Sequence, residues 1–157
     1  MENRIEVLRK YIDDTIQNLN DDNYFRKRAY THLYGVSHFC AMIALKREQN
    51  AELATMAGLL HDFYSYKMVD QVNHAEKGAI LARETLDFLK ITDEKETGLI
   101  CEAIHNHTDK INLHSDFDEI LKDADTLQPY LYNISVVETN EARKDRIKKL
   151  SEEFGLN

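Results

Sequence analysis

A histidine and an aspartate, His61 and Asp62, stand side by side at the end of an apolar run, ELATMAGLLHDF. Burying an imidazole and a carboxylate is costly unless the two groups are paired or bound to a metal ion. Four residues elsewhere in the chain carry the same ligand types: His32, His74, His107 and Asp125. Imidazole and carboxylate ligands together suit divalent ions such as Mn, Fe, Zn, Ni, Co or Mg. The sequence therefore predicts a site for one or two divalent ions, assembled from several segments.

Helical periodicity indicates which histidines and aspartates point inward. An apolar stripe at i, i+3, i+4 and i+7 passes through Val36, Phe39, Cys40 and Ile43. His32 lies one turn before this stripe and shares its face, whereas His38 points about 120° away. The same test assigns three further residues to inward-facing stripes: His74, His107 and Asp125. It assigns two residues to other faces: His105 and Asp123.

Each of these residues has an ordinary structural explanation when it is taken alone. A single histidine on an apolar stripe is typical of a hydrogen-bonded core residue, and a single aspartate can cap a helix or a loop. Six such groups without a cation would require several buried polar networks at once. We therefore favour a shared cation over the alternative, a purely structural helical protein that binds no metal.

The same periodicity predicts the elements that position these residues. Helices are expected at residues 4–19, 25–47, 51–63, 73–90, 116–127 and 139–153, and in a segment that Thr92 or Asp93 caps and that ends near His107. The segment at 51–63 is apolar almost all round, which predicts a buried central helix. One proline and five glycines argue against a turn-rich β architecture. We expect an all-α fold, a single domain of about six or seven helices over residues 1–157.

Connections and breaks are predicted at several positions between these helices. Residues 63–71 and 108–115 are expected to be connections, and the long second helix could bend near Gly35. Gln128 and Pro129 are expected to end or kink the helix at 116–127, because proline lacks a backbone N–H. The β-branched run at 134–137 is too short to imply a sheet.

Composition limits the classes of partner. The formal net charge is −8, so we expect no binding to nucleic acid polymers or to membranes. The first residues, MENRIEVLRK, contain no apolar leader, which predicts a cytoplasmic protein. Cys40 and Cys101 form no C-x-x-C pair and are interpreted as reduced core thiols. A homo-oligomer stays an open alternative.

The order of the motifs resembles that of the HD-domain phosphohydrolases, a helical superfamily of metal-dependent hydrolases. His32 in HLYGVSHF resembles the first ligand, His61-Asp62 in AGLLHDF resembles the pair that names the family, and Asp125 in LKDADTLQ resembles the last ligand. The resemblance covers about residues 25–135 and implies an HD-type helical bundle. His74 in NHAEKGA and His107 in AIHNHTDK match extra histidines of members with a fuller site, of which some bind two metals and others one.

This resemblance implies hydrolysis of a phosphoester or phosphoanhydride bond in a nucleotide or another small phosphorylated compound. The chain departs from three specialised branches of the family. It lacks the Gly-Tyr-Pro signature of cyclic-dinucleotide phosphodiesterases. Phe63 and Tyr64 stand where guanosine tetraphosphate hydrolases have a Glu-Asp pair, and the nearby glutamate of some nucleoside monophosphatases is missing. The small stand-alone hydrolases remain, and a non-catalytic, metal-stabilised nucleotide-binding or sensor module is the alternative.

The resemblance also implies roles for the individual residues. The metal ligands would be His32, His61, Asp62 and Asp125, and the ion would lower the pKa of its water toward about 7 for attack on phosphorus. Asp62 would also orient that water, while His74 and His107 would bind a second ion or protonate the leaving oxygen. Lys67 and Lys110 flank the motifs and could hold a substrate phosphate. Three tyrosines could line the pocket: Tyr64, Tyr66 and Tyr130.

Overall fold

The computed structural model describes residues 3–19 and 22–156, and within these ranges every regular element is a helix. The helices are α1 (Arg4–Gln17), α2 (Asn23–Lys46), α3 (Ala51–Leu60), α4 (Phe63–Met68), α5 (His74–Leu89), α6 (Glu94–Asn106), α7 (Asp116–Tyr132) and α8 (Glu141–Phe154). Seven of them have ten or more residues and α4 has six, so the predicted all-α class is confirmed. None of the described helices is both long and apolar enough to cross a membrane.

Side chains at the helix starts define several of these boundaries. The Asp22 carboxylate accepts a hydrogen bond from the Phe25 amide at 2.7 Å, and Asn50 caps α3 in the same way. Asp93, rather than Thr92, caps α6 and forms a capping box with Glu96. These contacts satisfy backbone N–H groups that a helix leaves without partners in its first turn.

The core lies where α2, α3 and α7 meet, and α3 is its centre. All eight residues from Leu53 to Leu60 are buried, as the apolar sequence of this segment predicts. α2 passes very close to α3 at Gly58, where an added Cβ would lie 2.6 Å from the Ser37 Cα. Only glycine permits this approach, which places the end of α3, and with it His61, beside α2.

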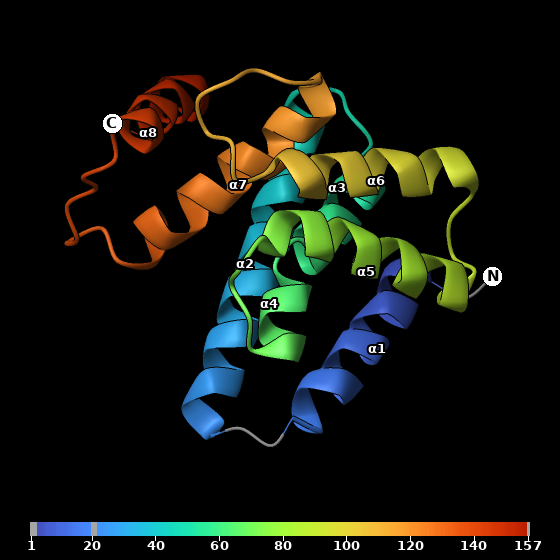
Figure 1. The fold of residues 1–157 in the computed structure, drawn as a ribbon. Helices are drawn as coiled ribbons and strands as arrows, with labels where there is room; N and C mark the ends of the chain where they lie inside the picture. The colour runs from blue at the N-terminus through green and yellow to red at the C-terminus, as the bar shows by residue number, and fades with distance from the viewer. Residues whose placement is uncertain (1–2, 20–21, 157) are drawn as a thin grey trace.

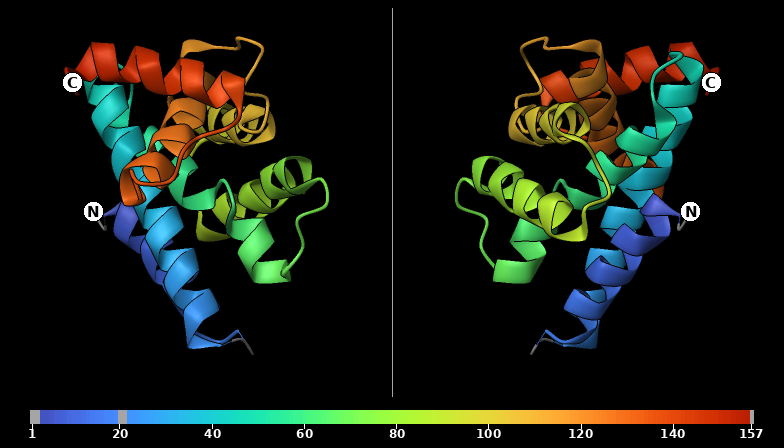
Figure 2. Two further views of the ribbon diagram at one scale, coloured as in Figure 1. Left: turned by 90° about the vertical axis from the view of Figure 1, so that its left-hand side faces the viewer. Right: turned by 90° about the vertical axis from the view of Figure 1, so that its right-hand side faces the viewer.

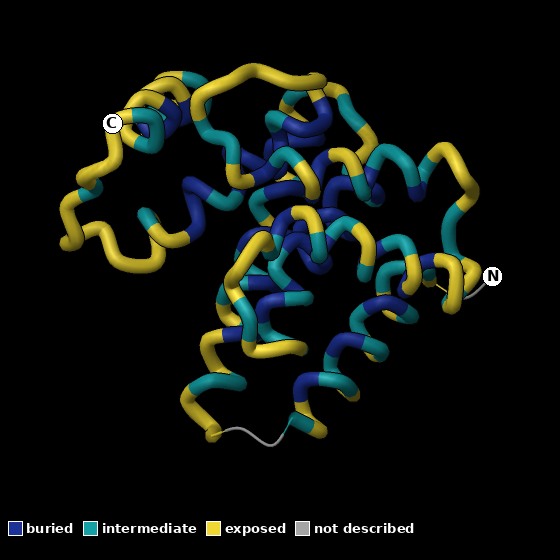
Figure 3. Tube along the Cα trace, viewed as in Figure 1, coloured by how far each residue is buried: buried dark blue, intermediate teal, exposed yellow. Residues whose placement is uncertain are grey.

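α8 lies across one end of the bundle, beside α7 and the C-terminal end of α2 (Figures 1 and 2). Ion pairs join the three helices there: Arg47, which follows α2, pairs with Asp123 of α7 and Glu153 of α8, at 2.8 and 2.7 Å. Arg146 of α8 pairs with the same Asp123 at 2.7 Å. The connections that follow α6 and α7 are largely exposed (Figure 3).

Two boundaries differ from the sequence-based expectation. Phe63–Met68, predicted as part of a connection, forms α4, because Phe63 and Ser65 are buried and the chain turns only at Val69, where φ is 52°. The helix predicted at 51–63 accordingly ends at Leu60. α2 runs without interruption through Gly35, where an added Cβ would lie 2.8 Å from the Gln128 Cγ.

The third difference concerns α7, which continues through Pro129 to Tyr132 instead of ending before it. Pro129 has no N–H, so the Asp125 carbonyl loses its usual helical donor. Arg143 of α8 donates to that carbonyl instead, with an Nη2 to O distance of 3.2 Å. A side chain from another helix therefore compensates for the proline.

Candidate metal centre

Four of the predicted ligands meet at the centre of the bundle. His32 Nε2 lies 3.1 Å from His61 Nε2 and 3.3 Å from Asp62 Oδ2. Asp125 Oδ1 approaches the same two imidazoles, at 3.4 Å from His32 Nε2 and 3.5 Å from His61 Nε2. The His61 side chain is fully buried, whereas Asp62 and Asp125 keep a small exposed fraction.

The other two predicted histidines gather on the second oxygen of Asp62. His74 Nε2 and His107 Nε2 each lie 3.4 Å from Asp62 Oδ1. The ligand atoms thus form two groups that could each hold a metal ion: His32, His61 and Asp62, and Asp62, His74 and His107. Asp62 belongs to both groups and presents one oxygen to each.

Five different parts of the fold deliver these six residues. His32 comes from α2, His74 is the first residue of α5, His107 ends α6, and Asp125 comes from α7. The His61-Asp62 pair occupies the break between α3 and α4, where Asp62 has φ −110° and ψ 7°. This break turns the Asp62 carboxylate out of the helical path, so that it reaches both groups of histidines.

Hydrogen bonds fix the tautomer of all four imidazoles in the same sense. Each Nδ1 lies within hydrogen-bond distance of an oxygen: Gln128 Oε1 for His32 (2.9 Å), Gly58 O for His61 (2.8 Å), Gln71 O for His74 (3.1 Å) and Ile104 O for His107 (2.6 Å). An amide or carbonyl oxygen can only accept, so each Nδ1 carries the proton and donates it. Each Nε2 therefore faces the carboxylates and is the nitrogen that a metal ion would bind.

A divalent cation fits this donor set. Unprotonated Nε2 atoms and carboxylate oxygens are all acceptors, so without a cation the buried cluster must hold a proton or leave acceptors facing one another. Asp62 Oδ1 shows this lack of a donor, since the atom is buried and has no hydrogen-bond partner. A bound cation would satisfy these atoms together, in the arrangement of histidine ligands oriented by their second nitrogen.

The electrostatics of the two carboxylates agree with a ligand role. Burial alone raises the pKa of Asp125, but the Lys110 ammonium, 2.7 Å from its Oδ2, holds that pKa well below its ordinary value. The pKa of Asp62 is likewise held well below the ordinary value, because the surrounding imidazoles, His61 first, outweigh its burial. Burial lowers the pKa of Lys110 itself. Both carboxylates are therefore ionised at neutral pH.

His32 is the imidazole most affected by these carboxylates. Burial by itself lowers the pKa of His32, but Asp125 and Asp62 outweigh burial and raise that pKa to about 10. A group with such a strong preference for positive charge marks the position where the protein would hold a cation.

The structure separates the two lysines predicted to hold phosphate. The Lys110 ammonium donates to Asp125 and to the Lys122 carbonyl, so it helps to hold the Asp125 carboxylate in place. Lys67 lies over the rings of Tyr11 and Phe63, with Nζ 5.9 and 5.8 Å from their centroids, and does not line the cavity described below.

The residues predicted to point away from the site do lie outside it. His38 and His105 are exposed. Asp123 is buried, but under α8, where Arg47 and Arg146 bind it. Periodicity along α7 distinguishes the face of Asp123 from that of Asp125, and only the fold shows that the former is covered by a second helix.

A cavity of about 840 Å³ opens on the first group of ligands. Its lining includes His32, Asp62 and Tyr66, and the rest of the lining comes from α2, the connection before α5, and α7: Tyr24, Lys27, Arg28, Thr31, Gln71, Gln128, Pro129 and Tyr132. Of the three tyrosines predicted to line a pocket, Tyr66 does so, whereas Tyr64 donates a hydrogen bond to Asp70 and Tyr130 packs against the core.

Sequence reasoning missed the contribution of α2 to this cavity. The lining residues of α2 recur at positions 24, 27, 28, 31 and 32, which is the helical spacing i, i+3, i+4, i+7 and i+8. This stripe is polar and shares a ligand, His32, with the metal centre. A polar stripe that ends on a metal ligand is the signal that could have located it.

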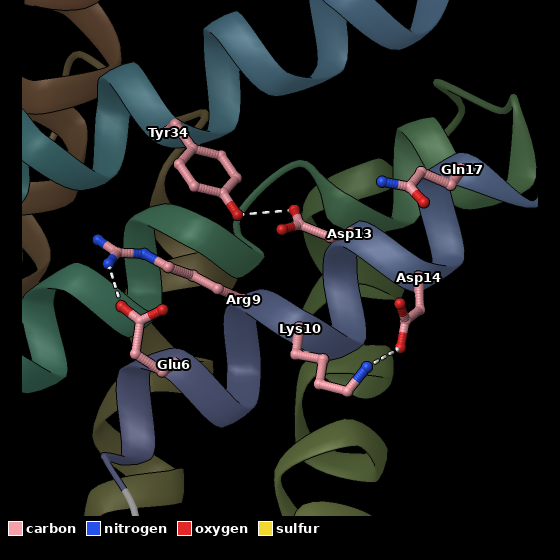
Figure 4. A pocket seen from close by; sticks show the side chains of 7 residues that line it. All are labelled: Glu6, Arg9, Lys10, Asp13, Asp14, Gln17 and Tyr34. Atoms are coloured by element: carbon pink, nitrogen blue, oxygen red, sulfur yellow. Dashed lines mark hydrogen bonds and ion pairs between the residues drawn. The ribbon is translucent and has the colours of Figure 1, made fainter.

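A second hollow lies between α1 and α2, away from the metal centre (Figure 4). Its charged side chains pair with one another: Glu6 with Arg9 and Lys10 with Asp14, while Tyr34 donates to Asp13 at 2.6 Å. None of the six ligands lines it. The cavity on the metal centre is therefore the better candidate for a substrate site.

Comparisons with known proteins agree with this geometry. The HD domain family model matches residues 29–130, which contain α3 to α6, most of α2 and α7, and all six candidate ligand residues. A crystal structure of a predicted HD superfamily hydrolase from an uncultured Thermotogales bacterium is similar in fold, with a TM-score of 0.58 and 24% sequence identity over 95% of this chain and 86% of that one. No curated protein matches the chain. Since the HD model spans most of the sequence and its helices carry all six converging ligands, the chain belongs to the HD domain family, whose members are typically metal-dependent hydrolases.

Proposed function

We propose that this protein is a metal-dependent phosphohydrolase that cleaves a phosphoester or phosphoanhydride bond in a nucleotide or another small phosphorylated compound. The observation that carries the proposal is the position of Asp62, whose two oxygens each lie between imidazole nitrogens. A carboxylate shared in this way suits a pair of divalent ions. The cavity beside it is large enough for a small phosphorylated compound.

The ligand arrangement supports two ions per chain. His32, His61 and Asp125 would hold the first ion together with one oxygen of Asp62. His74 and His107 would hold the second with the other oxygen. When bound, such ions activate water as a nucleophile and neutralise negative charge on a phosphoryl group.

The protein's own residues would position the substrate and fix the protonation states. Asp62 and Asp125 stay ionised because their pKa values lie well below the ordinary range. Tyr66, which lines the cavity, stays protonated because burial, followed by the charge of Asp62, raises its pKa to about 12. Its hydroxyl group can therefore donate a hydrogen bond to an oxygen of the substrate.

Metal analysis and a phosphoester panel test the proposal. We expect two divalent ions per chain, and release of phosphate or pyrophosphate from at least one nucleotide or small phosphoester by the metal-loaded protein. The Asp125→Ala variant should lose the ion proposed at His32, His61 and Asp62, and its activity, while its helical circular-dichroism signal stays. His105→Ala is the matched control, since His105 is an exposed histidine two residues from a ligand.

Two outcomes would contradict this function. An Asp125→Ala protein with full metal content and full activity would remove Asp125 from the centre. Saturable nucleotide binding to the metal-loaded protein, with no turnover of any phosphoester, would favour the non-catalytic sensor module instead.

A further inference from the structure

The cavity on the metal centre has a positively charged wall. Lys27 and Arg28 line it from α2, on the same helical stripe as His32. At about 1.5 Å of rise per residue, Arg28 lies about 6 Å and Lys27 about 7.5 Å along the helix axis from that ligand. A group bound at the metal centre would therefore have two cationic side chains beside it, toward the start of α2.

These two side chains have no internal partners. In the described part of the chain, neither Lys27 nor Arg28 forms a hydrogen bond or an ion pair, and both are exposed. Six of the other arginines pair with a carboxylate: Arg4, Arg9, Arg47, Arg83, Arg143 and Arg146. Arg26 donates to the Leu19 carbonyl. Within the described ranges, Arg28 is thus the one arginine that has neither a hydrogen bond nor an ion pair.

The overall charge makes this exception more informative. The chain has 28 acidic and 20 basic residues, so carboxylate partners are in excess. The carboxylate that lines the cavity, Asp62, is already engaged by imidazoles. Adjacent unpaired cations beside such a centre are suited to an anion that enters from outside, and a guanidinium matches phosphate oxygens in geometry.

We propose that Lys27 and Arg28 bind a second phosphate of the substrate, so that the cavity prefers compounds with two or more phosphates in series over monophosphates. This inference rests on the proposed function for the position of the first phosphate, at the metal centre. The next phosphate then lies against Arg28, and Lys27 adds charge one residue farther along the helix. The class of ligand is a nucleoside di- or triphosphate or an inorganic polyphosphate, which share this chemistry.

The test compares the binding of two probes to metal-loaded protein by calorimetry: inorganic phosphate and the non-hydrolysable imidodiphosphate. We expect the wild type to bind imidodiphosphate about tenfold more tightly than phosphate, since charge-assisted hydrogen bonds add to the metal contacts. In the Lys27→Gln/Arg28→Gln variant this ratio should fall close to one. The metal content of the variant, measured after each titration, should stay at the wild-type value because neither Lys27 nor Arg28 contacts a metal-binding residue.

A matched control removes the same charge elsewhere. Lys46→Gln/Lys95→Gln changes two exposed lysines outside the cavity and should keep the wild-type ratio. An equal ratio in the wild type and the Lys27→Gln/Arg28→Gln variant would overturn the inference, and so would equal binding of the two probes by the wild type.

These outcomes are distinct from failure of the proposed function. A protein that hydrolyses nothing but shows the expected binding ratio would support the phosphate site and contradict the hydrolase. A protein that hydrolyses phosphoesters, but whose binding ratio is the same in the wild type and in the Lys27→Gln/Arg28→Gln variant, would support the hydrolase and contradict the phosphate site. The source of the second phosphate follows from a third probe, an adenosine analogue with the same imidodiphosphate end. If the adenosine analogue binds more tightly than imidodiphosphate, the ligand is a nucleoside polyphosphate. If the two bind equally, the ligand is an inorganic polyphosphate. Both results support the inference.

Discussion

Among the four imidazoles, His32 depends on a side chain for its orientation. Its Nδ1 donates to Gln128 Oε1 across the gap between α2 and α7, at 2.9 Å. Gly35 makes room for this contact, since a Cβ there would meet the Gln128 side chain. Gln128 is 7% exposed, so no solvent-exposed group can easily replace it.

Replacing Gln128 with Ala should weaken metal binding about 10-fold to 100-fold, because a partner of this kind orients the ligand and fixes its tautomer. Equilibrium dialysis against a metal buffer measures the effect. Gln17→Ala, a change at an exposed position of α1, serves as the control and should bind metal normally. Wild-type affinity in the Gln128→Ala protein would show that His32 does not need this hydrogen bond.

The pKa of His32 predicts how metal binding depends on pH. In the metal-free folded protein this pKa is raised from the ordinary 6.5 to about 10. The raised value stabilises the metal-free fold fully below the unfolded pKa, and that contribution is lost as pH rises through the folded pKa. A divalent ion needs the unprotonated Nε2, so binding releases this proton and affinity should rise about tenfold per pH unit below that pKa.

Metal titrations between about pH 6 and about pH 9 measure this dependence. Calorimetry in two buffers of different ionisation enthalpy gives the number of protons released, for which we expect about one from His32. A metal affinity that stays constant over this range would contradict the assignment of the raised pKa to His32.

At the scale of the helices, replacing either of two glycines with alanine should change the free energy of unfolding in opposite directions. Gly58 lets α3 approach α2, and a Cβ there would lie 2.6 Å from the Ser37 Cα and 3.1 Å from the Cys40 Sγ. Gly98 lies inside α6, with nothing within 4 Å of an added Cβ. The Gly58→Ala change should therefore lower the free energy of unfolding by about 1–3 kcal/mol or more. The Gly98→Ala change should raise it by about 0.5–1 kcal/mol.

Urea unfolding of the two alanine variants checks both signs. Gly58→Ala should also weaken metal binding, since the Gly58 carbonyl accepts the Nδ1–H of His61 at 2.8 Å and moves with the helix. Gly98→Ala should leave metal binding unchanged. A Gly58→Ala protein of wild-type stability would mean that α2 and α3 can separate without cost.

Much of the centre could be predicted at the element scale because buried ligands obey helical periodicity. The stripe before Val36 located His32, and the stripe through Ile100 and Ile104 located His107. Periodicity reports which face of a helix is buried, so it could not show that an exposed polar face, with Lys27 and Arg28, borders a cavity.

Contacts between distant segments were also beyond the sequence. α7 continues through Pro129, and Arg143, from α8, donates to the Asp125 carbonyl that the proline leaves without a helical donor. The ion pair between Lys110 and Asp125 joins a connection to a helix, and no periodicity relates them. These features depend on how the helices are placed in three dimensions, which a one-dimensional pattern does not encode.

For the whole molecule, a metal ion bound at the candidate centre would be a cross-link between helices. Its ligands come from α2, the break between α3 and α4, α5, the end of α6, and α7, so unfolding must disperse all of them. An ion that binds only the folded state at 100 times its Kd stabilises that state by about 2.7 kcal/mol.

Removal of metal with a chelator should therefore lower the Tm by about 5–10 °C for a chain of this size. Thermal unfolding followed by circular dichroism measures the shift, and adding the metal back should restore the original Tm. The Asp62→Ala protein is the control: Asp62 belongs to both groups of candidate ligands, so without it the Tm should not respond to either treatment. An equal Tm with and without metal in the wild type would show that the centre does not link the helices energetically.

The way in which the other three imidazoles are held has a consequence for evolutionary change. His61, His74 and His107 donate to the backbone carbonyls of Gly58, Gln71 and Ile104, each three residues earlier in the chain. Every amino acid has that carbonyl, so mutation of a neighbouring side chain does not remove the acceptor. Drift in sequence can therefore proceed around these three ligands while their orientation is inherited with the backbone. Only His32 has a side-chain acceptor, Gln128, so only there can a single substitution outside the ligand set remove the acceptor itself.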